Sequence, residues 1–126
     1  MARIFITGSA DGLGQAAARR LVALGHGVVL HGRNRDRAQQ ALGAVPGALT
    51  ALDADLASIE QTRELAGQAN AAGPFQAVIH NAGVYRPGTA RRETVDGLAA
   101  RRRPATSSRA SPLRCGWLSA RSLRRR

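Results

Sequence analysis

A glycine-rich turn between an apolar strand and a helix is the feature that most constrains what this chain can fold into. Residues 4–7 form a short apolar run typical of a buried strand, and an amphipathic helix pattern begins at Leu13. Between them, Gly8 permits a tight turn, Gly12 lets the backbone approach a phosphate group, and Gly14 lets the helix pack close to the strand. Such a unit aims backbone N–H groups and the positive end of the helix dipole at one point, which predicts an anion-binding turn. A strand–helix turn without a ligand is the alternative.

Further apolar runs alternate with helical patterns along the first hundred residues. The runs cover residues 28–31, 48–54 and 75–80. We expect Asn34 to cap the second helix and Ser58 to cap the third, where Gln61 completes a capping box. Strands that alternate with helices predict an α/β fold, here a doubly wound parallel sheet in the order 3-2-1-4 with helices on both faces.

Three motifs resemble one family of dinucleotide-binding enzymes. The glycines of residues 7–14 are spaced Gly-x-x-x-Gly-x-Gly, Asp53-Ala54-Asp55-Leu56 follows the third run, and Asn81-Ala82-Gly83 follows the fourth. In this order and context they are similar to the short-chain dehydrogenase/reductase family. The resemblance covers about residues 2–98 and implies a Rossmann-like fold, truncated to the N-terminal cofactor-binding half. Residues 94–98 resemble the start of the family's next helix.

The resemblance implies which residues bind a dinucleotide cofactor. In the glycine turn these are Gly8, Ser9, Asp11, Gly12, Leu13 and Gly14. The Asp55 side chain would contact the adenine amino group, and Leu56 would line the adenine pocket. Asn81 would hold the ends of the central strands together, while Ala82 and Gly83 would let the cofactor lie close. The alternatives are a local turn cap at Asp55 and a simple turn at the Asn-Ala-Gly motif.

Arg33 and Asn34 follow the second apolar run, at the place that distinguishes NAD from NADP. An acid here would accept from the ribose 2′-hydroxyl of NAD, whereas an arginine pairs with the 2′-phosphate of NADP. We therefore predict NADP rather than NAD as the cofactor, with Arg33 as the specificity residue and Asn34 beside it. Arg35 and Arg37 are less favoured candidates, and a solvated helix surface is the alternative for all three arginines.

The residues that carry the family's chemistry are not found in this sequence. The family uses a helix asparagine, a serine after the fifth strand and a Tyr-x-x-x-Lys motif. All 19 basic residues here are arginine, no asparagine follows Asn81, and the single tyrosine, Tyr85, fits a loop position. We therefore predict that the sequence holds no catalytic residue. By lineage the protein is expected to be an NADP-dependent oxidoreductase that acts on a carbonyl or alcohol, but this chain alone is expected to be inactive. A non-catalytic nucleotide-binding fragment is the alternative, and neither substrate nor oligomeric state is predicted.

The charge of the chain changes abruptly at residue 98. Residues 1–98 hold ten arginines and all eight acids, whereas residues 99–126 hold nine arginines and no acid. Leucines recur every five residues in this second segment, a period that fits neither helix nor strand. We therefore divide the chain into a partial NAD(P)-binding domain, 1–98, and an arginine-rich tail, 99–126, that is disordered or translated from a shifted reading frame. Arginine triplets and Trp117 in the tail give a rival reading, non-specific nucleic-acid binding.

The remaining chemistry-bearing residues point to no further site. His26, His31 and His80 have no metal-ligand spacing, so we expect structural histidines and no metal. Cys115 is the single cysteine and cannot form an internal disulfide. The sequence has no secretory signal and no apolar run of membrane-spanning length, so we expect a cytoplasmic protein with no membrane partner.

Overall fold

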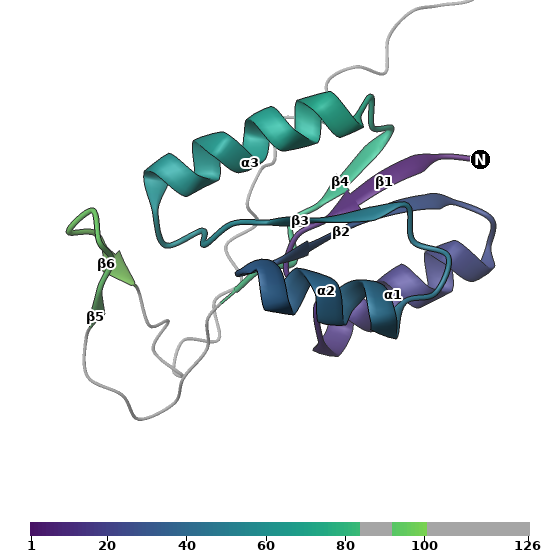
Figure 1. The fold of residues 1–126 in the computed structure, drawn as a ribbon, viewed down its shortest axis with the longest axis horizontal. Coiled ribbons are helices and arrows are strands. Elements are labelled where there is room, and N and C mark those ends of the chain that lie inside the picture. The colour runs from purple at the N-terminus through teal and green to yellow at the C-terminus, as the bar shows by residue number, and fades with distance from the viewer. Residues whose placement is uncertain (84–91, 101–126) are drawn as a thin grey trace, which may run out of the picture.

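Four parallel strands form a sheet between two layers of helices (Figure 1). The computed structural model describes residues 1–83 and 92–100. The strands are β1 (Arg3–Ile6), β2 (Gly27–Gly32), β3 (Thr50–Asp53) and β4 (Ala77–Ile79), and the helices are α1 (Gly12–Ala23), α2 (Arg35–Ala44) and α3 (Ile59–Ala72). The sheet order β3-β2-β1-β4 confirms the predicted topology. Tyr85, Cys115, Trp117 and the arginine triplets of the tail lie outside the described residues.

Alternate residues of the central strands supply the two cores on the two faces of the sheet. Ile4 and Ile6 of β1 pack with buried residues of α1 and α2 on one face. Phe5 points the other way and packs with Leu65 of α3 and with the ring of Phe75. Figure 1 shows the corresponding layers, with α1 and α2 below the sheet and α3 above it. Burial on both faces explains why the central strands read as continuous apolar runs.

The predicted helix caps are present, but the capping box is only half formed. Asn34 accepts a hydrogen bond from the Arg37 N–H at 2.9 Å, and Ser58 accepts one from the Gln61 N–H at 3.3 Å. The Gln61 side chain does not return to Ser58, whose N–H already donates to the Asp55 carbonyl. Gln61 instead accepts from the Asp55 N–H at 2.8 Å, so it secures the loop that precedes α3.

The prediction that a helix begins at residues 94–98 is wrong. This segment is the turn of a small antiparallel hairpin between β5 (Arg92–Glu93) and β6 (Ala99–Ala100). Gly97 has φ +71°, outside the helical region, and the Thr94 hydroxyl accepts from the Leu98 N–H at 3.1 Å. Asp96 in the turn accepts from the Ile59 N–H at 2.8 Å, so the hairpin lies against the start of α3.

Candidate functional site

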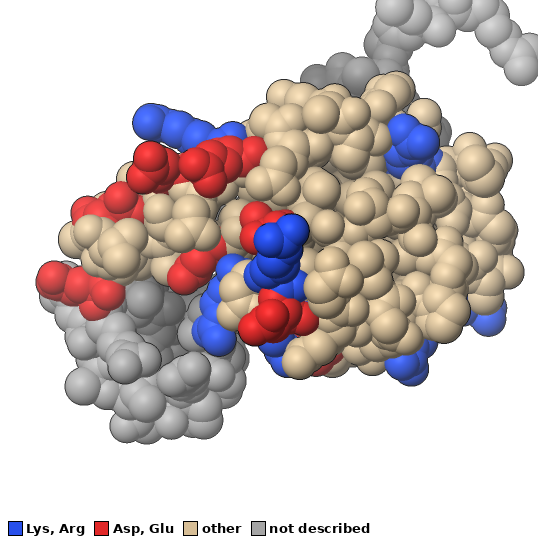
Figure 2. Space-filling model, viewed as in Figure 1, with Lys and Arg blue, Asp and Glu red and all other residues tan. Residues whose placement is uncertain are grey.

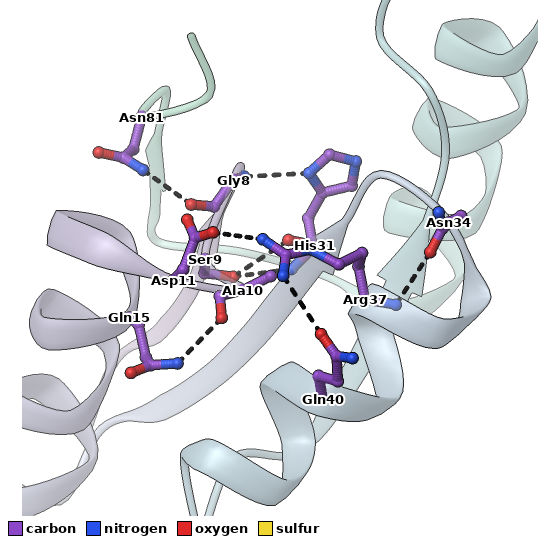
Figure 3. Close-up of polar contacts among 10 residues, drawn as sticks. All are labelled: Gly8, Ser9, Ala10, Asp11, Gln15, His31, Asn34, Arg37, Gln40 and Asn81. Carbon is purple, nitrogen blue, oxygen red and sulfur yellow. Dashed lines mark hydrogen bonds and ion pairs between the residues drawn. The ribbon is translucent and has the colours of Figure 1, made fainter. Parts of the chain in front are cut away.

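The glycine turn lies at the carboxyl end of β1, where its neighbours hold it from both sides (Figure 3). The Gly8 N–H donates to His31 Nδ1 at 3.0 Å, and the Gly8 carbonyl accepts from Asn81 Nδ2 at 2.9 Å. Gly8 has φ +64°, and a Cβ placed there would lie 2.8 Å from the Ala82 Cα. Only glycine meets both constraints. The glycine turn and the Asn-Ala-Gly motif, far apart in the sequence, are thus in direct contact.

Thr7 and Asn81 join the ends of β1 and β4. The Thr7 hydroxyl accepts from the N–H groups of Asn81 and Ala82, both at 3.1 Å, while the Thr7 N–H donates to the Ile79 carbonyl at 3.0 Å. The network joins the two strand ends, and the role that the resemblance implies for the Asn81 side chain stays a prediction. The network also brings the Ala82 backbone up to Gly8, so the two loops form one surface at the end of the sheet.

The start of α1 differs from the starts of the other two long helices because no side chain caps it. Asp11 stands at the N-cap position, but its side chain makes no hydrogen bond to the helix. Among the described residues, the N–H groups of Gly12, Leu13 and Gly14 have no hydrogen-bond partner. Three free donors at the positive end of a helix dipole fit a phosphate group.

The glycines of this helix start have different surroundings. A Cβ on Gly14 would collide with the Gly8 carbonyl oxygen, so α1 packs directly against the turn. Gly12 has φ +55°, and no atom lies within 4 Å of the position that its Cβ would occupy. The Leu13 side chain is 83% exposed. Gly14 thus lies in close packing and Gly12 in open space, and the cofactor contacts of Gly12, Leu13 and Gly14 stay predictions.

Ser9 holds the turn together from inside. Its side chain is fully buried, donates to the Ile6 carbonyl at 3.1 Å and accepts from the His31 N–H at 2.8 Å. Its own N–H donates to the His31 carbonyl at 3.0 Å. The polar groups of Ser9 are therefore used within the protein, and its contact with a cofactor stays a prediction.

Of the three candidate arginines, Arg37 reaches the glycine turn (Figure 3). Its guanidinium forms an ion pair with Asp11 and donates to Gln40 at 3.2 Å. The Asn34 cap fixes the first turn of α2 and so sets the position of Arg37. Arg33 and Arg35 are exposed, and their side chains form no hydrogen bond or ion pair with the described residues. The spacing of three residues between the Asn34 cap and Arg37 was the available signal for this contact.

A groove opens beside the glycine turn, on the face of the sheet that α3 covers. It has a volume of about 380 Å³. Its lining is mainly apolar and comprises Phe5, Thr7, Leu56, Thr62, Leu65, Ala66, Ala69, His80 and Ala82. The Asp55 carboxylate accepts from the Ala57 N–H at 2.9 Å, which is the local turn given as its alternative role. Leu56 lines this groove, and the adenine contacts of Asp55 and Leu56 remain predictions.

His31 is a residue of this site that the sequence reading left as structural. It is 3% exposed, its Nδ1 faces the glycine turn, and its Nε2 lies 2.9 Å from the Ala54 carbonyl. Burial lowers the pKa of His31, while the Ala54 carbonyl and the charge of Asp53 oppose this shift. The available signal was a lone titratable residue at the end of a strand that is otherwise apolar.

Charged side chains gather at the end of the molecule that carries these loops. Figure 2 shows acidic and basic groups close together on the left of this face, while much of the right part is uncharged. In residues 1–83 and 92–100, no three His, Cys, Asp or Glu side chains converge on a possible metal position. No helix in the described part of the chain is long and apolar enough to span a membrane.

The fold and the uncapped helix behind a glycine turn are typical of α/β proteins that bind a dinucleotide. A family model described as short chain dehydrogenase matches residues 2–99. The chain therefore belongs to the short-chain dehydrogenase/reductase family, as the motifs indicated. The match ends where the acid-free segment begins.

Known proteins of this family resemble the chain over part of their own length. An uncharacterized oxidoreductase of Emericella nidulans is 56% identical over 101 residues, which is 79% of this chain and 40% of the relative. The short-chain dehydrogenase chry4 of Gibberella zeae is 54% identical over 88 residues, 69% of this chain and 34% of the relative. The solved structure of a short-chain type dehydrogenase/reductase from Mycobacterium ulcerans has a TM-score of 0.58 and 27% identity, and the match covers 68% of this chain and 34% of that one. The chain thus spans well under half of these relatives.

Proposed function

We propose that residues 1–98 bind NADP and form the cofactor-binding part of an oxidoreductase that acts on a carbonyl or alcohol. The observation that carries this proposal is the uncapped start of α1, where three N–H groups lack a partner among the described residues. The starts of the other two helices, α2 and α3, are capped by the side chains of Asn34 and Ser58. A glycine turn that leaves its helix open is suited to bind the phosphates of a dinucleotide.

Each part of the site would have its own task in holding NADP. The free N–H groups of α1 would bind the pyrophosphate, and the open space at Gly12 would let it approach the backbone. The exposed Arg33 would pair with the 2′-phosphate, while Arg37 neutralises the Asp11 carboxylate beside the turn. The groove lined by Leu56 would take the adenine. The bound nicotinamide supplies hydride exchange with a substrate carbon, and the substrate itself is not defined by these residues.

The choice of NADP over NAD tests this arrangement. A charge-assisted hydrogen bond contributes about 1.5–3 kcal/mol, so we expect NADP to bind at least about tenfold more tightly than NAD. Calorimetric titration of both cofactors into the wild type and R33A should show this preference reduced in the variant. R37A measures the contribution of the arginine at Asp11, and R63A, which removes an exposed arginine from α3, is the matched control. Equal affinities of the wild type for both cofactors would refute the assignment of Arg33.

A further inference from the structure

His31 lies where three parts of the proposed cofactor site meet: the glycine turn, β2 and the loop after β3. Its Nδ1 accepts from the Gly8 N–H at 3.0 Å, and its Nε2 is 2.9 Å from the Ala54 carbonyl oxygen. The ring of Phe5 meets the imidazole edge-on, with 6.5 Å between the ring centroids. The imidazole is therefore fixed on both of its nitrogens and on its apolar side.

These partners leave the imidazole only one protonation state. A backbone N–H can only donate, so Nδ1 must be the unprotonated acceptor that faces Gly8. A carbonyl oxygen can only accept, so Nε2 must carry the hydrogen that faces Ala54. His31 is thus the neutral Nε2–H tautomer. Its burial favours the same state, because desolvation lowers the pKa of His31 below 6.5.

Within residues 1–83 and 92–100, the contact between the ring and Gly8 is one of two side-chain hydrogen bonds to the Gly8 backbone. Asn81 donates to the Gly8 carbonyl from the loop after β4, and His31 accepts from the Gly8 N–H at the end of β2. Backbone groups of His31 also bond to Ser9, and these bonds do not depend on the state of the ring. Protonation can therefore break the contact with Gly8 while the strand end stays in place.

We propose that His31 is a positioning residue for dinucleotide binding: its neutral ring holds the Gly8 peptide so that the free N–H groups of α1 face the phosphates, and protonation releases this hold. The inference rests on the proposed function of the turn. A proton on Nδ1 would point at the Gly8 N–H, so that two donors would face each other and the hydrogen bond would be lost. Acid conditions should then weaken cofactor binding through the protein.

The charged groups around the ring do not replace the lost acceptor. Asp53 on β3 acts on His31 through its charge. Asp11 in the glycine turn is paired with Arg37 of α2, and Asp55 in the loop after β3 accepts from the Ala57 N–H. Since none of these carboxylates accepts from Gly8, the state of the imidazole decides whether the Gly8 N–H has a partner.

Nuclear magnetic resonance of the wild-type chain tests the contact without any cofactor. Nitrogen shifts of the imidazole should show the Nε2–H tautomer near neutral pH. On acidification, the Gly8 amide should shift with the same midpoint as His31, below pH 6.5. A protonated Nδ1 at neutral pH, or a Gly8 amide that does not respond when His31 titrates, would overturn the proposal.

Two substitutions separate the two nitrogens of His31. In H31N the amide oxygen can still accept from Gly8, so NADP affinity near neutral pH should stay within about threefold of the wild type. In H31Q the longer side chain can reach the Ala54 carbonyl but not Gly8, so affinity should fall about tenfold, as expected for the loss of one hydrogen bond.

The pH dependence of binding completes the test. Below the measured pKa of His31, the wild type should lose about tenfold in NADP affinity relative to H31N. Ionisation of the 2′-phosphate cancels in this ratio, because both proteins bind the same ligand. A ratio that does not change with pH would overturn the proposal. If no variant and no wild type binds NADP at any pH, the proposed function fails, and the spectra alone then decide whether His31 holds Gly8.

Discussion

The two strands that flank β1 are covered very differently. All six residues of β2 are buried, whereas all three residues of β4 are exposed, Val78 by 46% and Ile79 by 36%. β2 lies between β1 and β3 and packs against α1 and α2, while β4 is the edge of the sheet and is followed by His80 and Ala82, which line the groove. The comparison shows that the β2 side of the sheet is covered by the first 83 residues. The side along β4 is left open by the described residues.

The largest expected effect concerns turnover, because turnover would require catalytic residues on the open side along β4. We expect the purified 126-residue chain not to oxidise NADPH with any member of a broad panel of carbonyl compounds. Its sequence has no lysine and therefore no Tyr-x-x-x-Lys motif to transfer the proton. The measurement is the absorbance of the reduced cofactor against protein-free controls. Oxidation that depends on the protein and disappears in Y85F would contradict this expectation.

Two valines measure the difference between the strands in stability. V28A removes two methyl groups from a fully buried position in β2 and should lower the free energy of unfolding by about 2–3 kcal/mol. V78A makes the same change in β4, where the side chain is half exposed, and should cost less than about 1 kcal/mol. Urea denaturation followed by circular dichroism gives both values. Equal losses would mean that β4 is covered in solution, and the comparison of the two strands would then be wrong.

The capped start of α3 and the uncapped start of α1 are expected to differ in how much they contribute to stability. S58A removes the side-chain cap of α3 and should cost about 1 kcal/mol of unfolding free energy. D11A removes no cap from α1, only an exposed ion pair with Arg37, and should cost less than about 0.5 kcal/mol. Thermal unfolding of both variants provides the measurement. A larger loss in D11A than in S58A would show that Asp11 does stabilise α1.

Local patterns were sufficient to predict the sheet order and the helix caps. In each case the information lies in short-range spacing, and the topology of parallel strands then brings the loops together. The prediction of a helix start at residues 94–98 was wrong because five residues are too few to distinguish a helix start from a turn. Gly97 takes a left-handed conformation there. His31 was missed because its partners, Gly8 and Ala54, lie in the loops that follow the two neighbouring strands, β1 and β3. The tail from residue 99 stays a prediction, and the nucleotide sequence would show whether its reading frame is shifted.

The last expected effect is the dependence of stability on pH through His31. Its pKa is lowered in the folded chain by burial, so between that value and 6.5 the unfolded chain binds more protons than the folded chain. Stability should therefore be complete above pH 6.5, decrease as the pH falls toward the folded pKa, and lose nothing further from His31 below it. The total loss is about 1.4 kcal/mol for each pH unit by which the pKa is lowered. Denaturation of the wild type and H31N across this range isolates the effect, because other groups titrate alike in both proteins. If H31N lost the same unfolding free energy on acidification, the His31 imidazole would not be the group that makes stability depend on pH.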